Sequence, residues 1–161
     1  MPDGKTHDNL WKYGQALAYP AGVLLSMSDW HIGLGAFTGY LIGRFITPDA
    51  DLVGITHGEG EIMRRFGCLG GLLVSYYTFY GFIFRGKHRS FWTHGLLIST
   101  AIRFIYTFWW LAWFLYNKEW LTDVVYLYGF GIFIGMAMAD IIHILADLAV
   151  SDSSIKSRKW R

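Results

Sequence analysis

The sequence is short of charged residues and almost without cysteine. Only 16% of its 161 residues are charged, and the net charge is +2. Because the basic residues are not gathered in a patch interleaved with aromatic ones, these figures exclude a typical nucleic-acid-binding protein. The single cysteine, Cys68, excludes an internal disulfide and a cysteine-based zinc site. Histidine, aspartate and glutamate are left as candidate metal ligands.

Apolar residues take the place of the missing charge. The sequence is 53% hydrophobic and 19% aromatic, with a mean hydropathy of +0.31. A soluble domain usually has about 25% charged residues, which cover the large surface of a small protein. The composition therefore predicts an integral membrane protein with an all-α fold. No internal repeat, low-complexity tract or linker is present, so residues 1–161 are expected to form a single membrane-embedded domain.

The apolar runs give the expected helices. A run of about 17–25 apolar residues can cross the bilayer as a helix, and such runs cover residues 13–28, 30–47, 95–116 and 121–150. A further segment, 66–84, is rich in glycine and tyrosine. This composition favours an interfacial or re-entrant segment over a helix that faces lipid.

The distribution of lysine and arginine supports four crossings. If segment 66–84 also crosses, the basic residues divide almost evenly between the two sides. If it does not cross, all of the basic residues except Arg103 and Lys118 fall on one side, together with both termini. They are Lys5, Lys12, Arg44, Arg64, Arg65, Arg85, Lys87, Arg89, Lys156, Arg158, Lys159 and Arg161. Cytoplasmic loops are rich in lysine and arginine, so we predict four transmembrane helices, one re-entrant or interfacial segment and cytoplasmic termini.

This topology brings polar residues from separate parts of the chain to the cytoplasmic face. They come before the first helix, at the end of the second and before the third. These residues are His7, Asp8, Asp49, Asp51, His88 and His94. Each has a simpler explanation when taken alone, because polar residues often cap helices or form solvated turns. His31, His57, Glu59 and Glu61 show no metal-ligand spacing, and we expect them to be solvated loop residues.

The fourth helix has the strongest signal. Asp140, His143 and Asp147 are spaced by three and four residues, so they project from one side of a helix. An ionisable side chain inside the membrane costs at least about 2.5–3.5 kcal/mol, and it rarely occurs without a partner or a function. A bound divalent metal ion would offset the two negative charges. Alternatively, Asp140 forms an ion pair with Arg103, which lies at a similar depth in the third helix.

Taken in order, these motifs resemble a known family. Thr6-His7-Asp8, Pro48-Asp49-Ala50-Asp51, His88-Arg89-Ser90-Phe91-Trp92-Thr93-His94 and His143-Ile144-Leu145-Ala146-Asp147 resemble the YdjM-like family of bacterial inner-membrane metal-dependent hydrolases. The first eight residues are most similar to cyanobacterial metal-binding relatives. The resemblance covers nearly the whole chain, and it implies a bacterial inner membrane or a thylakoid-like membrane.

The resemblance also implies a ligand set and a chemistry. The implied metal ligands are His7, Asp49, Asp51, His88, His94, His143 and Asp147. From their positions in the chain, we expect Asp8, Asp140 and Arg103 beside these ligands or as further ligands. That family is distantly similar to all-helical phospholipases C and nucleases, which cleave phosphoesters with a cluster of zinc ions. Because one zinc ion needs only about four ligands, this set predicts two or three divalent ions. Zinc is the first expectation, and iron or manganese also suits histidine and carboxylate ligands.

The expected reaction is hydrolysis of a phosphoester. Paired metal ions generate hydroxide from bound water and hold both reacting oxygens. Asp49 or Asp51 would bridge the ions or orient the water, and Arg89 would clamp the phosphate with two hydrogen bonds. These three are the predicted catalytic residues. A site at the membrane surface favours an amphiphilic substrate, so membrane lipid is an expected partner.

Two other function classes stay open. The first is a non-catalytic metal-binding membrane subunit, in which the ions join helix ends and the aromatic surface packs against a homo-oligomer or a larger complex. The second is a transporter or proton path that uses Arg103, Asp140 and Asp147, although the gathering of polar residues on one side disfavours it.

Overall fold

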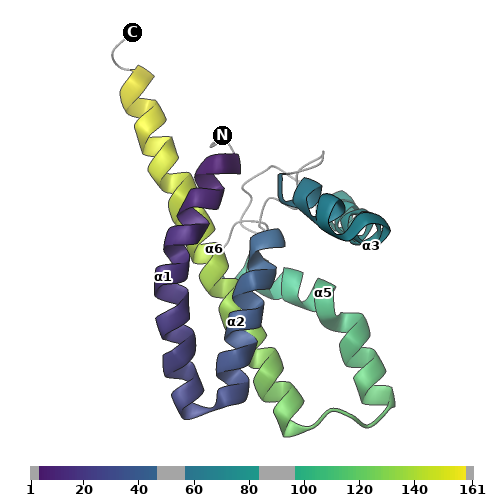
Figure 1. Cartoon of the computed structure of the whole chain (residues 1–161). Helices are drawn as coiled ribbons and strands as arrows, with labels where there is room; N and C mark the ends of the chain where they lie inside the picture. Colours follow the sequence, from purple (N-terminus) through teal and green to yellow (C-terminus); the bar gives the residue numbers. More distant parts are fainter. Residues whose placement is uncertain (1–3, 47–56, 84–96, 159–161) are drawn as a thin grey trace.

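The computed structural model describes residues 4–46, 57–83 and 97–158, excluding the side chains of residues 4–12, 17, 44, 57, 58 and 146–158. The described chain is helical, as the composition predicts, and Figure 1 shows the arrangement. The helices are α1 (Gly4–Ser28), α2 (Trp30–Phe45), α3 (His57–Ile83), α5 (Ile98–Asn117) and α6 (Asp123–Arg158).

Helices α1, α2 and α6 pack side by side along their length. Figure 1 shows that α1 and α2 form a hairpin and that α6 runs parallel to α2. The turn of the hairpin is set by Asp29, whose extended backbone precedes α2 and whose carboxylate accepts a hydrogen bond of 2.8 Å from the backbone N–H of His31. This N-cap satisfies one of the donors left open at a helix start.

The α2–α6 contact is built from glycine. A Cβ atom on Gly39 would lie 2.0 Å from the backbone oxygen of Ile132, and one on Gly135 would lie 2.0 Å from that of Ala36. The two backbones therefore touch where glycines recur at every fourth residue. This close approach is typical of membrane helices, whose association depends on backbone contact and van der Waals packing.

Helix α5 meets α6 near its own start and then leaves it. Figure 1 shows the two helices close together at the first turns of α5 and apart toward the loop that joins them. The apolar core lies on the side of the close contact, where Ile46, Tyr77, Tyr80, Ile132 and Met136 are buried. Much of the rest of α5 exposes large aromatic side chains.

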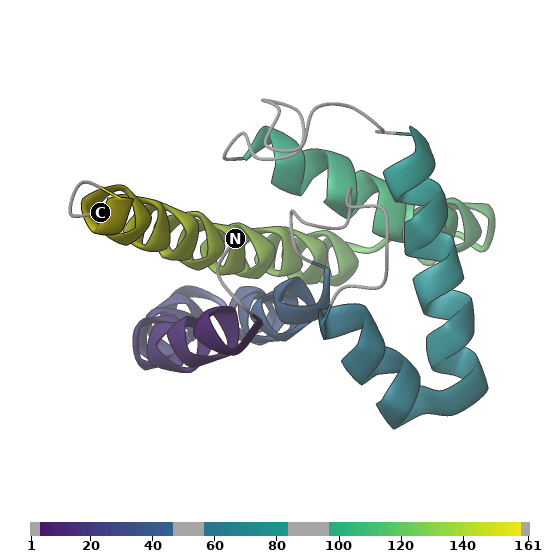
Figure 2. The same cartoon turned by 90° about the horizontal axis from the view of Figure 1, so that it is seen from above.

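Helix α3 runs across the other helices and is kinked. Its break is at Gly67, which has φ 54° and ψ −126°, a conformation that side chains with a Cβ rarely adopt. Figure 2 shows the two arms of α3 lying across the long axes of α1, α2 and α6. Tyrosines join α3 to α5, since Tyr106 Oη donates to the backbone oxygen of Tyr76 over 2.8 Å and Tyr76 Oη donates to that of Tyr106.

The number and identity of the membrane-crossing candidates correct our expectation. Within the described residues, three helical stretches are long and apolar enough to cross: Glu59–Ile83, Ile98–Asn117 and Asp123–Leu145. The expectation of four spans plus a re-entrant segment 66–84 is therefore wrong, because most of that segment belongs to one of the candidates. Helix α2 has only 16 residues, about 24 Å, which is short of the roughly 30 Å hydrocarbon core.

The helix bounds also differ from the apolar runs. Helix α1 begins at Gly4, well before the apolar run, and α6 continues to Arg158. Glu59 and Glu61 lie in α3 and are only 8% and 9% exposed, so the expectation of solvated loop residues is wrong for them. Glu61 accepts a salt bridge of 2.5 Å from Arg65, one turn further along. His57 begins the same helix, and His31 lies in the first turn of α2.

Candidate metal centre

A cluster of buried polar side chains lies where α5 meets α6. Ser99, Thr100 and Arg103 come from α5, and Asp140 and His143 come from α6. Arg103 is 0% and Asp140 is 2% exposed. The burial of charge on this scale is costly unless the groups are paired and hydrogen-bonded.

Arg103 joins three helices. Its Nη2 donates to Asp140 Oδ2 on α6, its Nη1 donates to the backbone oxygen of Ile46 at the end of α2, and its Nε donates to Ser99 Oγ over 3.3 Å. The ion pair with Asp140 is one of the two alternatives that the sequence left open for that carboxylate. The planar guanidinium suits this role because its donors point in fixed directions.

Asp140 uses one oxygen for these contacts. Thr100 Oγ1 and Arg103 Nη2 both donate to Oδ2. The other oxygen, Oδ1, is buried and has no hydrogen-bond partner among the described residues. His143 lies one turn further along α6 and is 8% exposed. At a spacing of three residues, the two side chains share one side of the helix.

The end of α2 lies against this cluster. Gly43, in the last turn, is so close to α6 that a Cβ atom there would lie 2.5 Å from Cβ of Ala139, the residue before Asp140. Three residues further on, the backbone oxygen of Ile46 accepts a hydrogen bond from Arg103 Nη1. Asp49 follows three residues later in the sequence and lies outside the described residues.

The first turns of α1 lie at a similar level. Gly14 of α1 contacts Ile142 of α6, where a Cβ atom would lie 2.3 Å from Cδ1 of the isoleucine. From this contact, α1 runs back to His7 over about 10 Å and α6 runs on to Asp147 over about 8 Å, at 1.5 Å per residue. Because the two helices are antiparallel (Figure 1), both backbone positions lie beyond the same end of the cluster.

The remaining predicted residues are not placed. Asp49, Asp51, His88, Arg89 and His94 lie outside the described residues, whereas His7, Asp8 and Asp147 have described helical backbones but no described side chains. Among the side chains that the structure describes, no group of three His, Cys, Asp or Glu residues is close enough to hold a metal ion. The structure thus brings together Arg103, Asp140 and His143 from the predicted set.

Sequence reasoning missed three partners in this cluster. Ser99 and Thr100 precede Arg103 by four and three residues, so they occupy the same side of α5. That spacing of polar residues in an apolar run could have identified both. The role of Ile46 is a backbone contact, for which the sequence has no signal.

A comparison with known families identifies the chain. A family model matches residues 2–157. The chain belongs to the family Uncharacterized metal-binding protein (DUF2227). This agrees with the predicted metal binding, but the family description specifies neither the metal nor a reaction. No curated protein and no solved structure matches the chain. The YdjM-like hydrolase assignment stays a prediction.

Two described residues of this DUF2227 member, Asp140 and His143, have side chains of the kind that bind divalent ions. A carboxylate oxygen and an imidazole are ligands that zinc, iron and manganese accept. Asp140 Oδ1 is buried without a described hydrogen-bond partner, which is costly for a charged oxygen. A bound cation would offset that cost.

Proposed function

We propose that this DUF2227 protein is a membrane-embedded metal-dependent hydrolase of amphiphilic phosphoesters. The observation that supports the site is the buried pair Asp140 and His143 at the level where α2 ends, with Asp140 Oδ1 lacking a described partner. The chain segments that follow α2 and precede α5 contain most of the other predicted ligands. We propose two or three divalent ions, zinc first. Their proposed ligands are His7, Asp49, Asp51, His88, His94, His143 and Asp147, with Asp140 as a further ligand through Oδ1.

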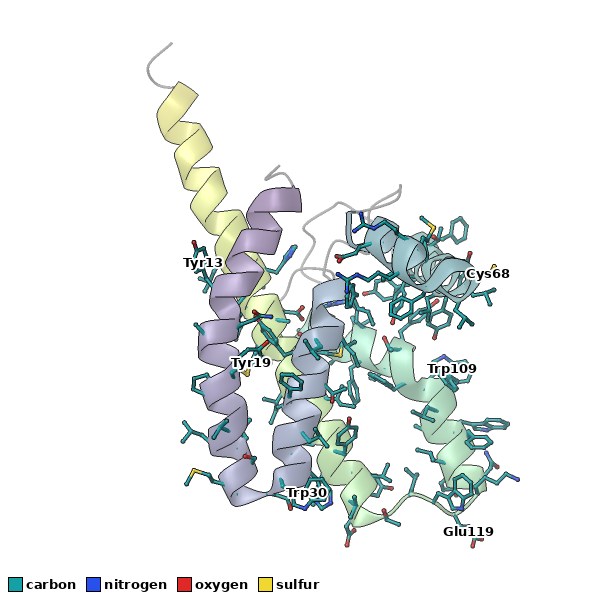
Figure 3. All side chains as sticks on the ribbon, in the orientation of Figure 1. Tyr13, Tyr19, Trp30, Cys68, Trp109 and Glu119 are labelled. Carbon is teal, nitrogen blue, oxygen red and sulfur yellow. The ribbon has the colours of Figure 1, made fainter. Side chains whose placement is uncertain are left out.

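The distribution of aromatic and basic residues supports a membrane orientation. Trp30 and Glu119 lie at one end of the bundle in Figure 3, and Trp30, Tyr116 and Trp120 are exposed there. Exposed tryptophan and tyrosine are typical of the bilayer interface. The start of α1 and the end of α6 lie toward the opposite end (Figure 1), and these stretches include Lys5, Lys12, Lys156 and Arg158. By the positive-inside rule, this end and the proposed site face the cytoplasm.

Each predicted residue would have a separate role in phosphoester hydrolysis. Bound divalent ions supply Lewis acidity and lower the pKa of water. Asp49 or Asp51 would orient the attacking water and accept its proton as the new P–O bond forms, while the P–O bond to the alcohol breaks and the departing alkoxide takes up a proton from solvent. Arg89 binds the phosphate through two parallel N–H groups. Buried Arg103 already pairs with Asp140, so its charge offsets the carboxylate and it does not bind substrate.

Elemental analysis of the detergent-purified chain tests this proposal. We expect about two or three divalent ions per chain and hydrolysis of phosphatidic acid or phosphatidylglycerol in mixed micelles. His143→Ala and Asp49→Ala should lose both metal and hydrolysis. His31→Ala is the matched control, because this histidine pairs with Asp29 at the other end of the bundle. A wild-type chain without metal, or a His143→Ala variant with full metal and activity, would contradict the proposal.

A non-catalytic metal-binding subunit is the second candidate. It is favoured by Arg103, which donates two hydrogen bonds to other helices, one to Asp140 on α6 and one to the backbone oxygen of Ile46 at the end of α2. In that case, the ions would stabilise the junction of helices for packing in a larger complex. Full metal content with no hydrolysis of any phosphoester, together with dissociation or aggregation on chelation, would favour the subunit over the hydrolase.

A further inference from the structure

The last turn of α2 ends in a buried environment. The final carbonyl groups of a helix have no partner within the helix, and the helix dipole gives them partial negative charge. Ile46 is only 7% exposed, so water is a poor partner for its backbone oxygen. Arg103 Nη1 donates to this oxygen. A buried cation at the end of α2 thus satisfies both the hydrogen bond and the dipole.

The same guanidinium orients Asp140. Arg103 Nη2 and Thr100 Oγ1 both bind Oδ2, which fixes the carboxylate from one side. Oδ1 is then the oxygen with no described hydrogen-bond partner. The Nε contact to Ser99, one turn back on α5, restrains the guanidinium itself.

From these contacts we infer that Arg103 is the positioning residue of the proposed metal site. It holds the end of α2 and the carboxylate of Asp140 in one fixed relation, which fixes the position of Asp140 Oδ1 relative to the end of α2. This inference rests on the proposed function, since it assigns Arg103 a role in a metal site there. It assigns no metal-ligand bond and no contact with substrate to Arg103.

The variant Arg103→Lys distinguishes this positioning role from simple charge pairing with Asp140. A lysine at position 103 keeps one positive charge for Asp140, but its single ammonium group lacks the planar fork that reaches Asp140, Ile46 and Ser99 together. Residues that orient metal ligands typically change metal affinity by about 10–100-fold when they are replaced. A merely structural ion pair would instead change the stability of the metal-free protein and leave the affinity unchanged.

The experiment titrates metal-free protein in detergent with Co²⁺, whose visible absorption reports the coordination of the ion. We expect Arg103→Lys to bind Co²⁺ about 10–100-fold more weakly than wild type, with a shifted spectrum. Tyr77→Phe is the matched control, because it removes a part-buried hydrogen bond of 2.8 Å between α3 and Thr107 of α5 and leaves the partners of the Arg103 side chain in place. It should bind Co²⁺ with wild-type affinity and spectrum.

The outcomes distinguish the inference from the proposed function. Wild-type affinity and an unchanged spectrum for Arg103→Lys would overturn the positioning role alone, whereas a wild-type chain that binds no Co²⁺ and contains no metal would overturn both. If Arg103→Lys does not fold, the Co²⁺ affinity of Thr100→Val tests the positioning role instead. This variant removes one donor to Asp140 Oδ2 without leaving a buried charge unpaired. A several-fold weaker affinity would support the inference, and an unchanged affinity would overturn it.

Discussion

Replacing Gly135 by alanine tests how the bundle is held together. The added Cβ atom would lie 2.0 Å from the backbone oxygen of Ala36 and 2.5 Å from the backbone nitrogen of Tyr40, whereas ordinary contact begins at 3.4 Å. Backbone atoms cannot rotate away, so α2 and α6 must separate by about 1 Å at this level. A gap of that size removes about a quarter to a half of the dispersion energy of each affected contact.

Overpacking and helix propensity have opposite effects on the free energy of unfolding of Gly135→Ala. Overpacking typically costs about 1–3 kcal/mol and occasionally more, and the contact with backbone puts Gly135→Ala at the upper end. Alanine recovers up to about 1 kcal/mol through its helix propensity. We therefore expect a loss of about 2 kcal/mol or more, which lowers Tm by roughly 4–8 °C for a chain of this size.

Thermal unfolding in detergent, followed by circular dichroism, measures this loss. Gly129→Ala is the matched control because it lies on the same helix and a Cβ atom there has no atom within 4 Å. It should leave Tm unchanged or raise it slightly, since alanine favours the helix. Equal Tm values for Gly135→Ala and Gly129→Ala would refute the claim that backbone contact with α2 holds the bundle.

Three further predictions concern charge and metal. Arg103→Ala leaves the Asp140 carboxylate buried and unpaired, so it should destabilise the fold by about 3–5 kcal/mol, while replacing both residues by methionine should restore most of the loss in thermal unfolding. Chelation should lower Tm and added Zn²⁺ should restore it, because a ligand that binds only the folded state stabilises it; an unchanged Tm would count against a bound metal. The backbone N–H of His31 lowers the pKa of Asp29 below its ordinary 3.8, so this cap stabilises above that pH and is lost as the pH falls through the lowered pKa. Between about pH 5 and pH 3, where a carboxylate titrates, Asp29→Asn should therefore show a smaller fall in Tm than wild type.

The sequence predicted the helices and part of the polar cluster for clear physical reasons. Apolar runs near residues 30–47 and 95–116 mark helices because a membrane requires every backbone group to be bonded within the segment. Arg103 and Asp140 are charges of opposite sign at similar depth on antiparallel neighbours, so counting residues along each helix gave their pairing as one of two alternatives. Hydropathy did not show the true start of α1 at Gly4, because a helix continues through polar residues at no cost to its own hydrogen bonds.

The errors arise where burial depends on tertiary packing. Glu59 and Glu61 were expected in solvent because charged residues are seldom buried, but helix α3 buries both. The charge count also treated segment 66–84 as a separate re-entrant or interfacial element. It is instead most of the second arm of α3, which follows the break at Gly67, and its tyrosines bind α5. Contacts between tyrosine hydroxyls and helix carbonyls leave no periodic pattern in a sequence.

The glycine contacts and the polar cluster form one structural unit. Along α2, glycines at 35, 39 and 43 each approach α6 too closely for a side chain, and the last of them lies against Ala139. The next residue of α6 is Asp140, and α2 ends three residues after Gly43. Backbone contact therefore sets the register of the two helices, and this register brings the oxygen of Ile46 and the carboxylate of Asp140 within reach of one guanidinium. Arg103 can join them because smaller residues first brought the helices together.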